Sequence, residues 1–376
     1  MAATETGEGA GDAETATASV VGASGFAGGE LLRLLAGHPN FEVAQATSRE
    51  YANKTVGSVH PNLRSLDLRF SAPSALDSVD VLFSAAPHGV AMEHIEEWRE
   101  VADTVVDLSA DFRLDTEGQY DEWYDGHTAP EHLDDAVYAL PELACEDLGG
   151  ADLIASGGCN ATATILGLLP LHEAGLLDGA KVVVDVKVGS SEGGAGGGAA
   201  SSHPERSGVV RPYAPTGHRH EAEIEQALGL SVSFTAHAVD MVRGASATCH
   251  VFPASDASGG SEDEQSESSG IPTETPSKGD LWGAFRETYG DEPFVETVAG
   301  GSGAYRYPEP KVVAGTNNAE VGFEVDPENG RVVTFAAIDN VVKGSAGQAV
   351  HAANVALGHE ETAGLDHLGL HPVGGP

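Results

Sequence analysis

Short apolar runs and amphipathic stretches alternate along residues 19–108. The apolar runs predict strands at 19–22, 41–46, 79–84 and 104–108, and stretches with apolar residues at helical spacing predict helices at 30–36 and 91–99. Strands and helices that alternate at such short intervals are typical of a parallel sheet with helices on both faces. We therefore expect an α/β fold for this part of the chain.

The pattern becomes richer in strands after Cys159. A helix is predicted at 161–174, a very glycine-rich stretch follows at 189–198, and another helix is predicted within 341–357. The predicted strands of this part lie at 181–188, 230–236, 245–252, 312–314, 321–325 and 332–338. A chain of 376 residues exceeds the usual size of one hydrophobic core, so we expect a second domain, built on a mostly antiparallel sheet.

Acidic residues dominate the charge of the chain. It has 58 Asp and Glu against 19 Lys and Arg, a formal net charge of −39. This balance argues against nucleic acid as a partner, because phosphate binding needs a basic face. The acids are spread along the whole chain, which favours a halophile, whose high-salt cytoplasm screens repulsion among carboxylates. The alternative is an acidic tail that binds a basic partner.

Two segments lack the apolar residues that a packed core needs. The leader 1–17 is rich in Glu, Thr, Ala and Gly, and 254–278 is rich in Ser, Glu, Asp, Gly and Pro, so we expect a disordered acidic leader and a solvated loop insertion. No apolar run reaches the roughly 18 residues of a membrane span. The three cysteines, Cys145, Cys159 and Cys249, form no CxxC pair. We expect a cytoplasmic protein without a metal site.

A glycine-rich turn follows the first predicted strand. Its spacing is GxxGxxG, and it leads into the first predicted helix, whose N-terminus is suited to hold a pyrophosphate. The turn predicts a dinucleotide site at Gly22, Ser24, Gly25, Phe26, Ala27 and Gly28. At the end of the second strand, Ser48 and Arg49 suit a 2′-phosphate and favour NADP over NAD, although Glu50 follows immediately.

Cys159 is the candidate nucleophile. An apolar run ends in two glycines just before it, and small residues that open a helical stretch follow it. A thiol at a helix N-terminus meets unpaired N–H groups and the positive end of the helix dipole, so we expect its pKa to be lowered and the thiolate to be present near neutrality. The alternative is a small buried hydrophobic residue.

The candidate partners of the thiol are cationic or can become so. Arg113 follows a predicted strand end and is suited to a phosphate, the alternative being a surface ion pair with Asp111 or Asp115. Basic residues outnumber acidic ones in 203–220, which predicts an anionic ligand near Arg206, Arg211, His218, Arg219 and His220, the alternative being a solvated turn. We expect His218 or His220 to exchange protons with the thiol, and the spacing does not choose between them. His237 is a more remote candidate.

Six motifs in order identify a family that this chain resembles. They are 22–31, 83–89, 106–113, the Cys159 segment, 217–224 and 339–349, and the resemblance spans about residues 18–358. The chain resembles the N-acetyl-γ-glutamyl-phosphate reductases and their carrier-protein-linked relatives in arginine and lysine biosynthesis. The resemblance implies an NADP-binding Rossmann domain at 18–159, completed by a helix at 341–358. It also implies an α+β catalytic and oligomerisation domain at 160–340, with an assembly of two or four copies.

The same resemblance implies a chemistry. NADPH would reduce an acyl phosphate by way of a thioester on Cys159, with a histidine of the His218/His220 pair as acid and base. Asn340 would contact the cofactor near its nicotinamide, and Asn317 lies in another family-like segment at the domain junction.

The residues around Cys159 separate two branches of that family. Enzymes acting on the free acetylated substrate usually have Pro-Gly-Cys-Tyr-Pro-Thr, whereas this chain has Gly157-Gly-Cys-Asn-Ala-Thr162. The variant resembles the branch whose substrate is held by LysW, a small acidic amino-carrier protein, as a γ-glutamyl or δ-aminoadipyl phosphate. The alternatives are the acetylated substrate, aspartate-semialdehyde dehydrogenase chemistry, and an NADP-sensing protein without turnover.

Overall fold

The computed structural model describes residues 15–254 and 275–372, which form two seven-stranded sheets. Residues 1–14 and 255–274 lie outside the described part, and with them most of the predicted leader and loop insertion. The first strand begins at Ala16, inside the predicted leader, and a helix capped by Ser277 begins at Lys278, so both predicted segments are too long at one end.

The first sheet is wholly parallel, in the order β3-β2-β1-β4-β5-β7-β6. Its strands are β1 Ala16–Val21, β2 Phe41–Thr47, β3 Phe70–Ser71, β4 Val79–Ser84, β5 Ala102–Asp107, β6 Ala136–Ala139 and β7 Leu153–Ser156. The chain order reverses at β1, between β2 and β4, and such a switch point is where open α/β sheets bind ligands. The expected Rossmann-type sheet is confirmed.

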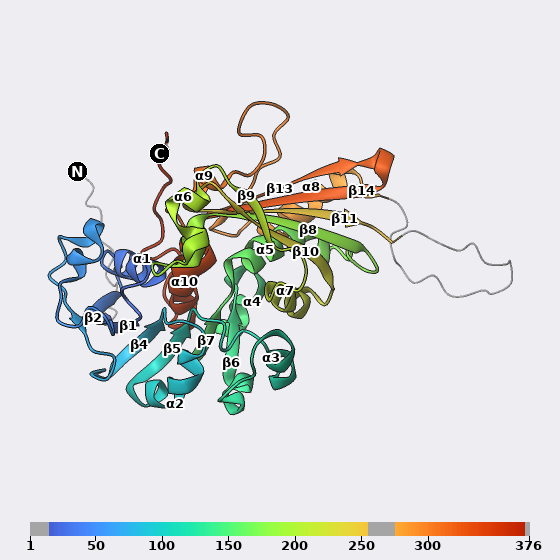
Figure 1. Ribbon diagram of the computed structural model, residues 1–376. Helices are drawn as coiled ribbons and strands as arrows, with labels where there is room; N and C mark the ends of the chain where they lie inside the picture. The colour runs from blue at the N-terminus through green and yellow to red at the C-terminus, as the bar shows by residue number, and fades with distance from the viewer. Residues whose placement is uncertain (1–14, 255–274, 373–376) are drawn as a thin grey trace, which may run out of the picture.

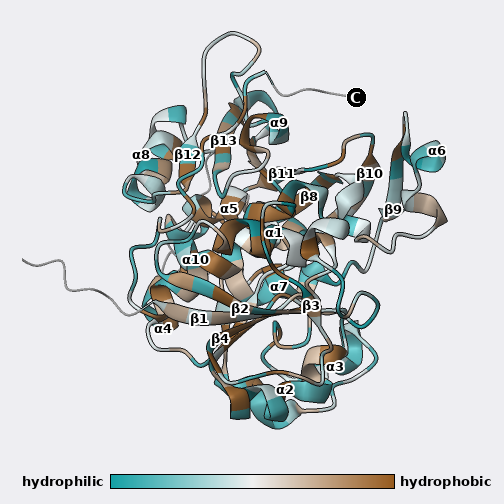
Figure 2. Ribbon diagram, turned by 90° about the vertical axis from the view of Figure 1, so that its left-hand side faces the viewer, coloured by the Kyte–Doolittle hydropathy of each residue, from teal (hydrophilic) through white to brown (hydrophobic). Residues whose placement is uncertain are grey.

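Helices cover this sheet because their apolar positions recur at helical spacing. They are α1 Phe26–Leu35, α2 Val90–Val101, α3 Glu117–Trp123 and α4 Pro141–Leu148. The last helix, α10 Gly347–Ala356, returns from the other half of the chain and packs against α1 and α4 (Figure 1). In Figure 2 the outer helix α2, at the bottom of the view, has both teal and brown residues, and brown residues also mark the strands of the sheet above it.

The second sheet has the order β12-β13-β14-β11-β8-β10-β9. Its strands are β8 Lys181–Val188, β9 Val210–Ala214, β10 Val232–Val239, β11 Ala245–Phe252, β12 Val295–Thr297, β13 Ala319–Asp326 and β14 Arg331–Ile338. Only the β12–β13 and β8–β10 pairs are parallel, so the sheet is mostly antiparallel, as predicted.

Three helices, α5 Cys159–Glu173, α7 His220–Leu228 and α8 Lys278–Tyr289, belong to this second layer. Helix α5 is the central one, since every residue from Asn160 to Leu171 is buried and it contacts α7, α8 and β11. Along β8 buried and partly exposed residues alternate, as expected for a sheet with one face on the core.

The strand predicted at 312–314 is wrong. Residues 310–313 form the short helix α9 Pro310–Val313, because Pro310 occupies a first-turn position where its ring is compatible with a helix and its missing N–H costs nothing. A run of two valines is too short to distinguish the two structures by periodicity. Over 15–254 and 275–372, no helix has both the length and the hydropathy that crossing a membrane would require.

Candidate active site

Cys159 is the first residue of α5, and it lies where the two sheets meet. The preceding strand β7 belongs to the parallel sheet, while α5 packs on the mixed sheet. Gly344, in the π-helical turn Val342–Ala346 before α10, presses on the cysteine, because a Cβ added at 344 would lie 2.5 Å from Cβ of Cys159. Cys159 thus lies between the end of β7 and a turn in which position 344 has no room for a side chain.

Gly158 is the N-cap of α5, and two of the predicted partners of the thiol lie against it. A Cβ at this position would collide with the imidazole of His220 and would lie 2.9 Å from Nη1 of Arg113. Glycine at 158 therefore allows an imidazole and a guanidinium to approach the backbone next to Cys159. The structure brings Arg113, Cys159 and His220 together from three different elements.

The two histidines of the 217–220 motif have different surroundings. His220 begins α7, its Nε2 faces Gly158, and its Nδ1 has no hydrogen-bond partner among the described residues. His218 instead packs against Phe234, with ring centroids 5.0 Å apart, and its Nδ1 accepts a 3.1 Å hydrogen bond from the backbone N–H of His220. His220 is thus the histidine that lies against Gly158, the neighbour of Cys159, while His218 packs behind it.

Glu223 is a site residue that the sequence analysis missed. It is fully buried, and its carboxylate accepts hydrogen bonds from the N–H of Gly158 at 2.7 Å, the hydroxyl of Tyr138 at 3.0 Å and Nη1 of Arg113 at 3.3 Å. Nε2 of His220 is 3.8 Å away, one helical turn before it in α7. The signal that could have found it is the i, i+3 spacing of His220 and Glu223 on one helix face.

Arg113 is oriented by the ends of two parallel strands. Its Nε donates to the carbonyl of Ser156 at 2.7 Å and its Nη2 to the carbonyl of Leu108 at 2.9 Å. The ion pair predicted as the alternative, with Asp111 or Asp115, does not form, and the carboxylate partner is Glu223. These two hydrogen bonds to backbone carbonyls hold the guanidinium beside Gly158. Its position there therefore does not depend on a bound ligand.

The other predicted phosphate ligands lie in different settings. Arg206 is buried and donates to the carbonyls of Val188 at 2.6 Å and Val239 at 2.9 Å, with Glu192 at 3.4 Å. Arg211 is more exposed and donates to the carbonyl of Glu205 at 3.1 Å. His237, the remote candidate base, lies 2.9 Å from Asp185 in the second sheet and is not part of the group around Gly158.

The expected low pKa of Cys159 is wrong for this structure. Burial raises the pKa of the thiol to about 12, the carboxylate of Glu192 adds to the rise, and the guanidinium of Arg113 opposes it. Burial also lowers the pKa of His220 to about 3, together with the positive charges of Arg113 and Arg219. The pair therefore consists of a neutral thiol and a neutral imidazole, because desolvation and two nearby carboxylates outweigh the helix N-terminus.

A cavity of about 1130 Å³ runs along the carboxyl ends of β1 and β4. Its lining includes the predicted cofactor residues Gly22, Ser24, Gly25, Phe26, Ala27, Ser48 and Arg49. Gly22 has φ +72°, and a Cβ on it would lie 2.6 Å from the carbonyl of Ala85. Gly28 supports the turn from behind, since its Cβ would lie 2.6 Å from the carbonyl of Gly22. A cradle that only glycine can form fits the phosphates of a dinucleotide.

The far side of the same cavity belongs to the second domain. Residues Glu192 to Gly196 of the glycine-rich stretch line it. Asn340 holds this stretch, since its side chain exchanges hydrogen bonds of 3.0–3.1 Å with Ser191 and accepts one of 2.7 Å from the N–H of Gly244. Asn317 is buried with neither side-chain atom paired among the described residues. Both asparagines lie at the domain junction.

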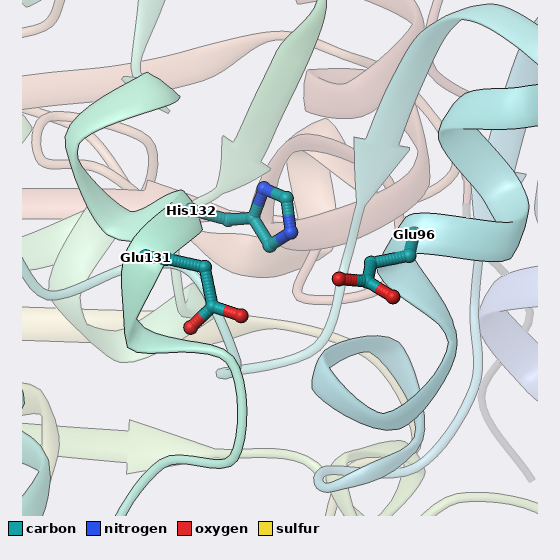
Figure 3. Close-up of side chains that lie close together, drawn as sticks. All are labelled: Glu96, Glu131 and His132. Atoms are coloured by element: carbon teal, nitrogen blue, oxygen red, sulfur yellow. The ribbon is translucent and has the colours of Figure 1, made fainter.

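One group of side chains has metal-like geometry within the described ranges. Glu96 on α2 and Glu131 and His132 on a following turn offer ligand atoms within 4.8 Å of one another (Figure 3). Nη1 of Arg99, however, lies 3.1 Å from Nδ1 of His132. A guanidinium at that ring nitrogen repels a cation, and both glutamates are exposed, so we assign no metal to the group.

Comparison with known proteins identifies both halves of the chain. Residues 17–151 match the family model of the semialdehyde dehydrogenase NAD-binding domain, and residues 159–340 match that of the semialdehyde dehydrogenase dimerisation domain. Among solved structures, aspartate semialdehyde dehydrogenase II of Vibrio cholerae superposes with a TM-score of 0.68 at 16% identity, over 91% of this chain and 98% of that one. The enzyme of Candida albicans with NADP gives 0.64 at 16% identity, with the same coverage. At such identity the likeness shows a shared fold.

Closer relatives are found by sequence. The chain is 72% identical over 361 residues to a protein of Natronomonas pharaonis and 72% identical over 363 residues to one of Haloarcula marismortui. The matches cover 96% of this chain and 99% and 100% of those proteins, which provisionally carry the name LysW-L-2-aminoadipate/LysW-L-glutamate phosphate reductase. The protein with that name in Saccharolobus solfataricus is 45% identical over 94% of this chain and 98% of its own length.

Proposed function

This chain belongs to the semialdehyde dehydrogenase family, among relatives named LysW-L-2-aminoadipate/LysW-L-glutamate phosphate reductases, and on that premise we propose that it reduces a LysW-linked acyl phosphate to a semialdehyde. The observation that carries the proposal is the group around Gly158, where Cys159, His220 and Arg113 meet beside a dinucleotide cleft. The reaction would serve the biosynthesis of arginine, lysine or both. The branch motif Gly157-Gly-Cys-Asn-Ala-Thr162 supports the carrier-linked substrate.

The first step forms a thioester. Sulfur of Cys159 attacks the acyl carbon, the bond from that carbon to the phosphate oxygen breaks, and inorganic phosphate leaves toward Arg113. Arg211 is a further phosphate contact. The guanidinium of Arg206 already donates to backbone carbonyls and pairs with Glu192, so Arg206 attracts the phosphate by its charge only. The thiol proton passes to His220 as the sulfur attacks.

The substrate itself prepares His220 for this role. The positive charges of Arg113 and Arg219 contribute to the low pKa of the ring. A phosphate bound beside Arg113 offsets those charges, so the pKa of His220 rises and the ring becomes a better proton acceptor. The proton transfer is thereby restricted to the substrate-bound site.

NADPH, bound in the cleft, supplies the hydride that reduces the thioester. His220 returns its proton to the oxygen of the reduced thioester, and collapse of the thiohemiacetal releases the semialdehyde and restores the thiol of Cys159. We propose NADP in place of NAD because Ser24 and Ser48, joined by a 2.9 Å hydrogen bond, and Arg49 offer hydroxyl and guanidinium donors where a 2′-phosphate would lie. Asn317 and Asn340 would orient the nicotinamide end.

The second domain is proposed to assemble the enzyme as a homodimer or a homotetramer, since its matching family model is a dimerisation domain. Light scattering after gel filtration in molar KCl measures the number of copies. A monomer in that salt would contradict this part of the proposal.

The test of the activity is a steady-state assay in molar KCl, run in the oxidising direction with inorganic phosphate and NADP or NAD. LysW-linked glutamate and aminoadipate semialdehydes, N-acetylglutamate semialdehyde and aspartate semialdehyde are compared by kcat/KM. We expect NADP reduction with the LysW-linked compounds and none with the Cys159→Ser variant. A preference for the acetylated or the aspartate compound would refute the proposed substrate, and turnover by the variant would refute the nucleophile.

A further inference from the structure

Glu192 is an acidic side chain at the site for which the proposed mechanism has no use. It lies in the turn Ser190–Gly193, which follows β8, and lines the dinucleotide cleft. It is also the largest electrostatic influence on the Cys159 thiol, ahead of Arg113 and Glu223. Tyr213, which donates to this carboxylate, also accepts a 3.3 Å hydrogen bond from Nδ2 of Asn160, so the carboxylate is linked through one side chain to the residue next to Cys159.

The position of the carboxylate is fixed from both sides. Tyr213 donates its hydroxyl hydrogen to Oε2 of Glu192 at 2.9 Å, and Arg206 lies 3.4 Å from Oε1. The backbone of the turn is bonded to the loop after β10, since the N–H groups of Ser190 and Ser191 donate to carbonyls of that loop at 2.8 and 3.0 Å. These partners give the Glu192 carboxylate a fixed position in the site, unlike that of a mobile surface side chain.

The two ends of the cleft suit different halves of a dinucleotide. Its glycine cradle and the Ser48–Arg49 corner fit the phosphates and the adenosine half of a dinucleotide. The reacting ring at the other end must meet an acyl group on the sulfur of Cys159. Residues Glu192 to Gly196 line the same cleft, and the Tyr213 hydroxyl joins Glu192 to Nδ2 of Asn160, the residue after Cys159, at 2.9 and 3.3 Å, so we assign this end to the nicotinamide.

We propose that Glu192 is the counter-charge of the oxidised nicotinamide, an inference that rests on the proposed NADPH-dependent reduction. The nicotinamide ring is neutral in NADPH and carries one positive charge in NADP⁺. When a hydride, one proton and two electrons, passes from the ring to the thioester carbon, the ring gains that charge near the carboxylate. Glu192 stabilises the charged ring, while Arg113 and His220 face the oxygen that becomes negative on the acyl group. Separate partners for the two developing charges favour hydride transfer toward the aldehyde.

Binding experiments without substrate test this assignment. Dissociation constants of NADP⁺ and NADPH are measured separately by fluorescence titration in molar KCl for the wild type and for Glu192→Gln. We expect the Kd of NADP⁺ to rise about fivefold to tenfold in Glu192→Gln, since one partly screened carboxylate is removed, and that of NADPH to stay within about twofold. Glu192→Asp, which keeps the charge, should restore part of the preference. Glu225→Gln, an exposed glutamate of α7 outside the cleft, is the matched control.

A second readout needs no nucleotide. Removing the Glu192 charge lowers the pKa of the Cys159 thiol, so iodoacetamide should modify Cys159 faster in Glu192→Gln than in Glu225→Gln at the same pH. If both nucleotides bind but their Kd ratio is unchanged in Glu192→Gln, the counter-charge is refuted and the proposed function stands. If the wild type binds neither nucleotide, the proposed function falls and the inference with it.

Discussion

The protonation state of Cys159 can be tested directly, because the structure and the usual expectation for a helix-terminal cysteine disagree. Burial and the charge of Glu192 raise the pKa of the thiol from 9.0 to about 12. This shift lowers the thiolate fraction below pH 9 on the order of a thousandfold. At pH 8 about one unperturbed thiol in ten would be ionised, against roughly one in ten thousand for Cys159.

Alkylation by iodoacetamide measures the fraction, since the thiolate is the reacting species. A Cys145→Ser background removes the exposed cysteine, and Cys249 is buried, so the signal comes from Cys159. The Cys145→Ser/Cys159→Ser variant supplies the blank. The rate constant is measured from pH 6 to pH 10 in molar KCl, without substrate or nucleotide, and a free cysteine peptide serves as the reference.

We expect a rate that rises about tenfold for each pH unit across this range and stays well below that of the peptide. The neutral imidazole of His220, with a pKa of about 3, provides no positive charge that would hold the thiolate. A fast plateau with a midpoint between pH 5 and pH 7 would instead show a thiolate–imidazolium pair. That result would refute the conclusion that burial outweighs the helix N-terminus.

Three further perturbations test other parts of the site. His220→Asn should lower kcat by about 10²–10⁴, whereas His218→Asn should act mainly on the thermal midpoint; equal losses of kcat would contradict the assignment of His220. Gly158→Ala should lower kcat on the order of a hundredfold, because its methyl group displaces His220 and Arg113. The Kd of NADPH, measured by fluorescence, should stay the same. Full activity of this variant would show that the close approach of these side chains to Gly158 is not required. Because the net charge is −39, the midpoint of thermal unfolding measured by circular dichroism should rise from dilute buffer to molar KCl as salt screens repulsion, and a midpoint independent of salt would contradict the halophilic interpretation.

Much of the fold follows from local patterns. Strands β4, β8 and β11 lie at the predicted residues, because a short apolar run in β4 and the alternation of apolar and polar residues in β8 and β11 are sufficient to predict them. The parallel and the mostly antiparallel sheet follow from the spacing of strands and helices. The failures are the short elements, such as α9, where four residues carry too little periodicity to separate helix from strand.

The sequence by itself determined which chemistry is present: a thiol at a glycine-rich helix start, a histidine pair, a phosphate cradle and an acidic surface. Only the tertiary structure decided how these groups act on one another. It placed His220, and not His218, against Gly158, bonded Glu223 to the same backbone, and raised the pKa of the Cys159 thiol, which the local motif predicts to be low. The reason is that desolvation and Coulomb interactions depend on distances between segments far apart in the chain, such as Arg113, Cys159 and Glu223, and no local pattern encodes those distances.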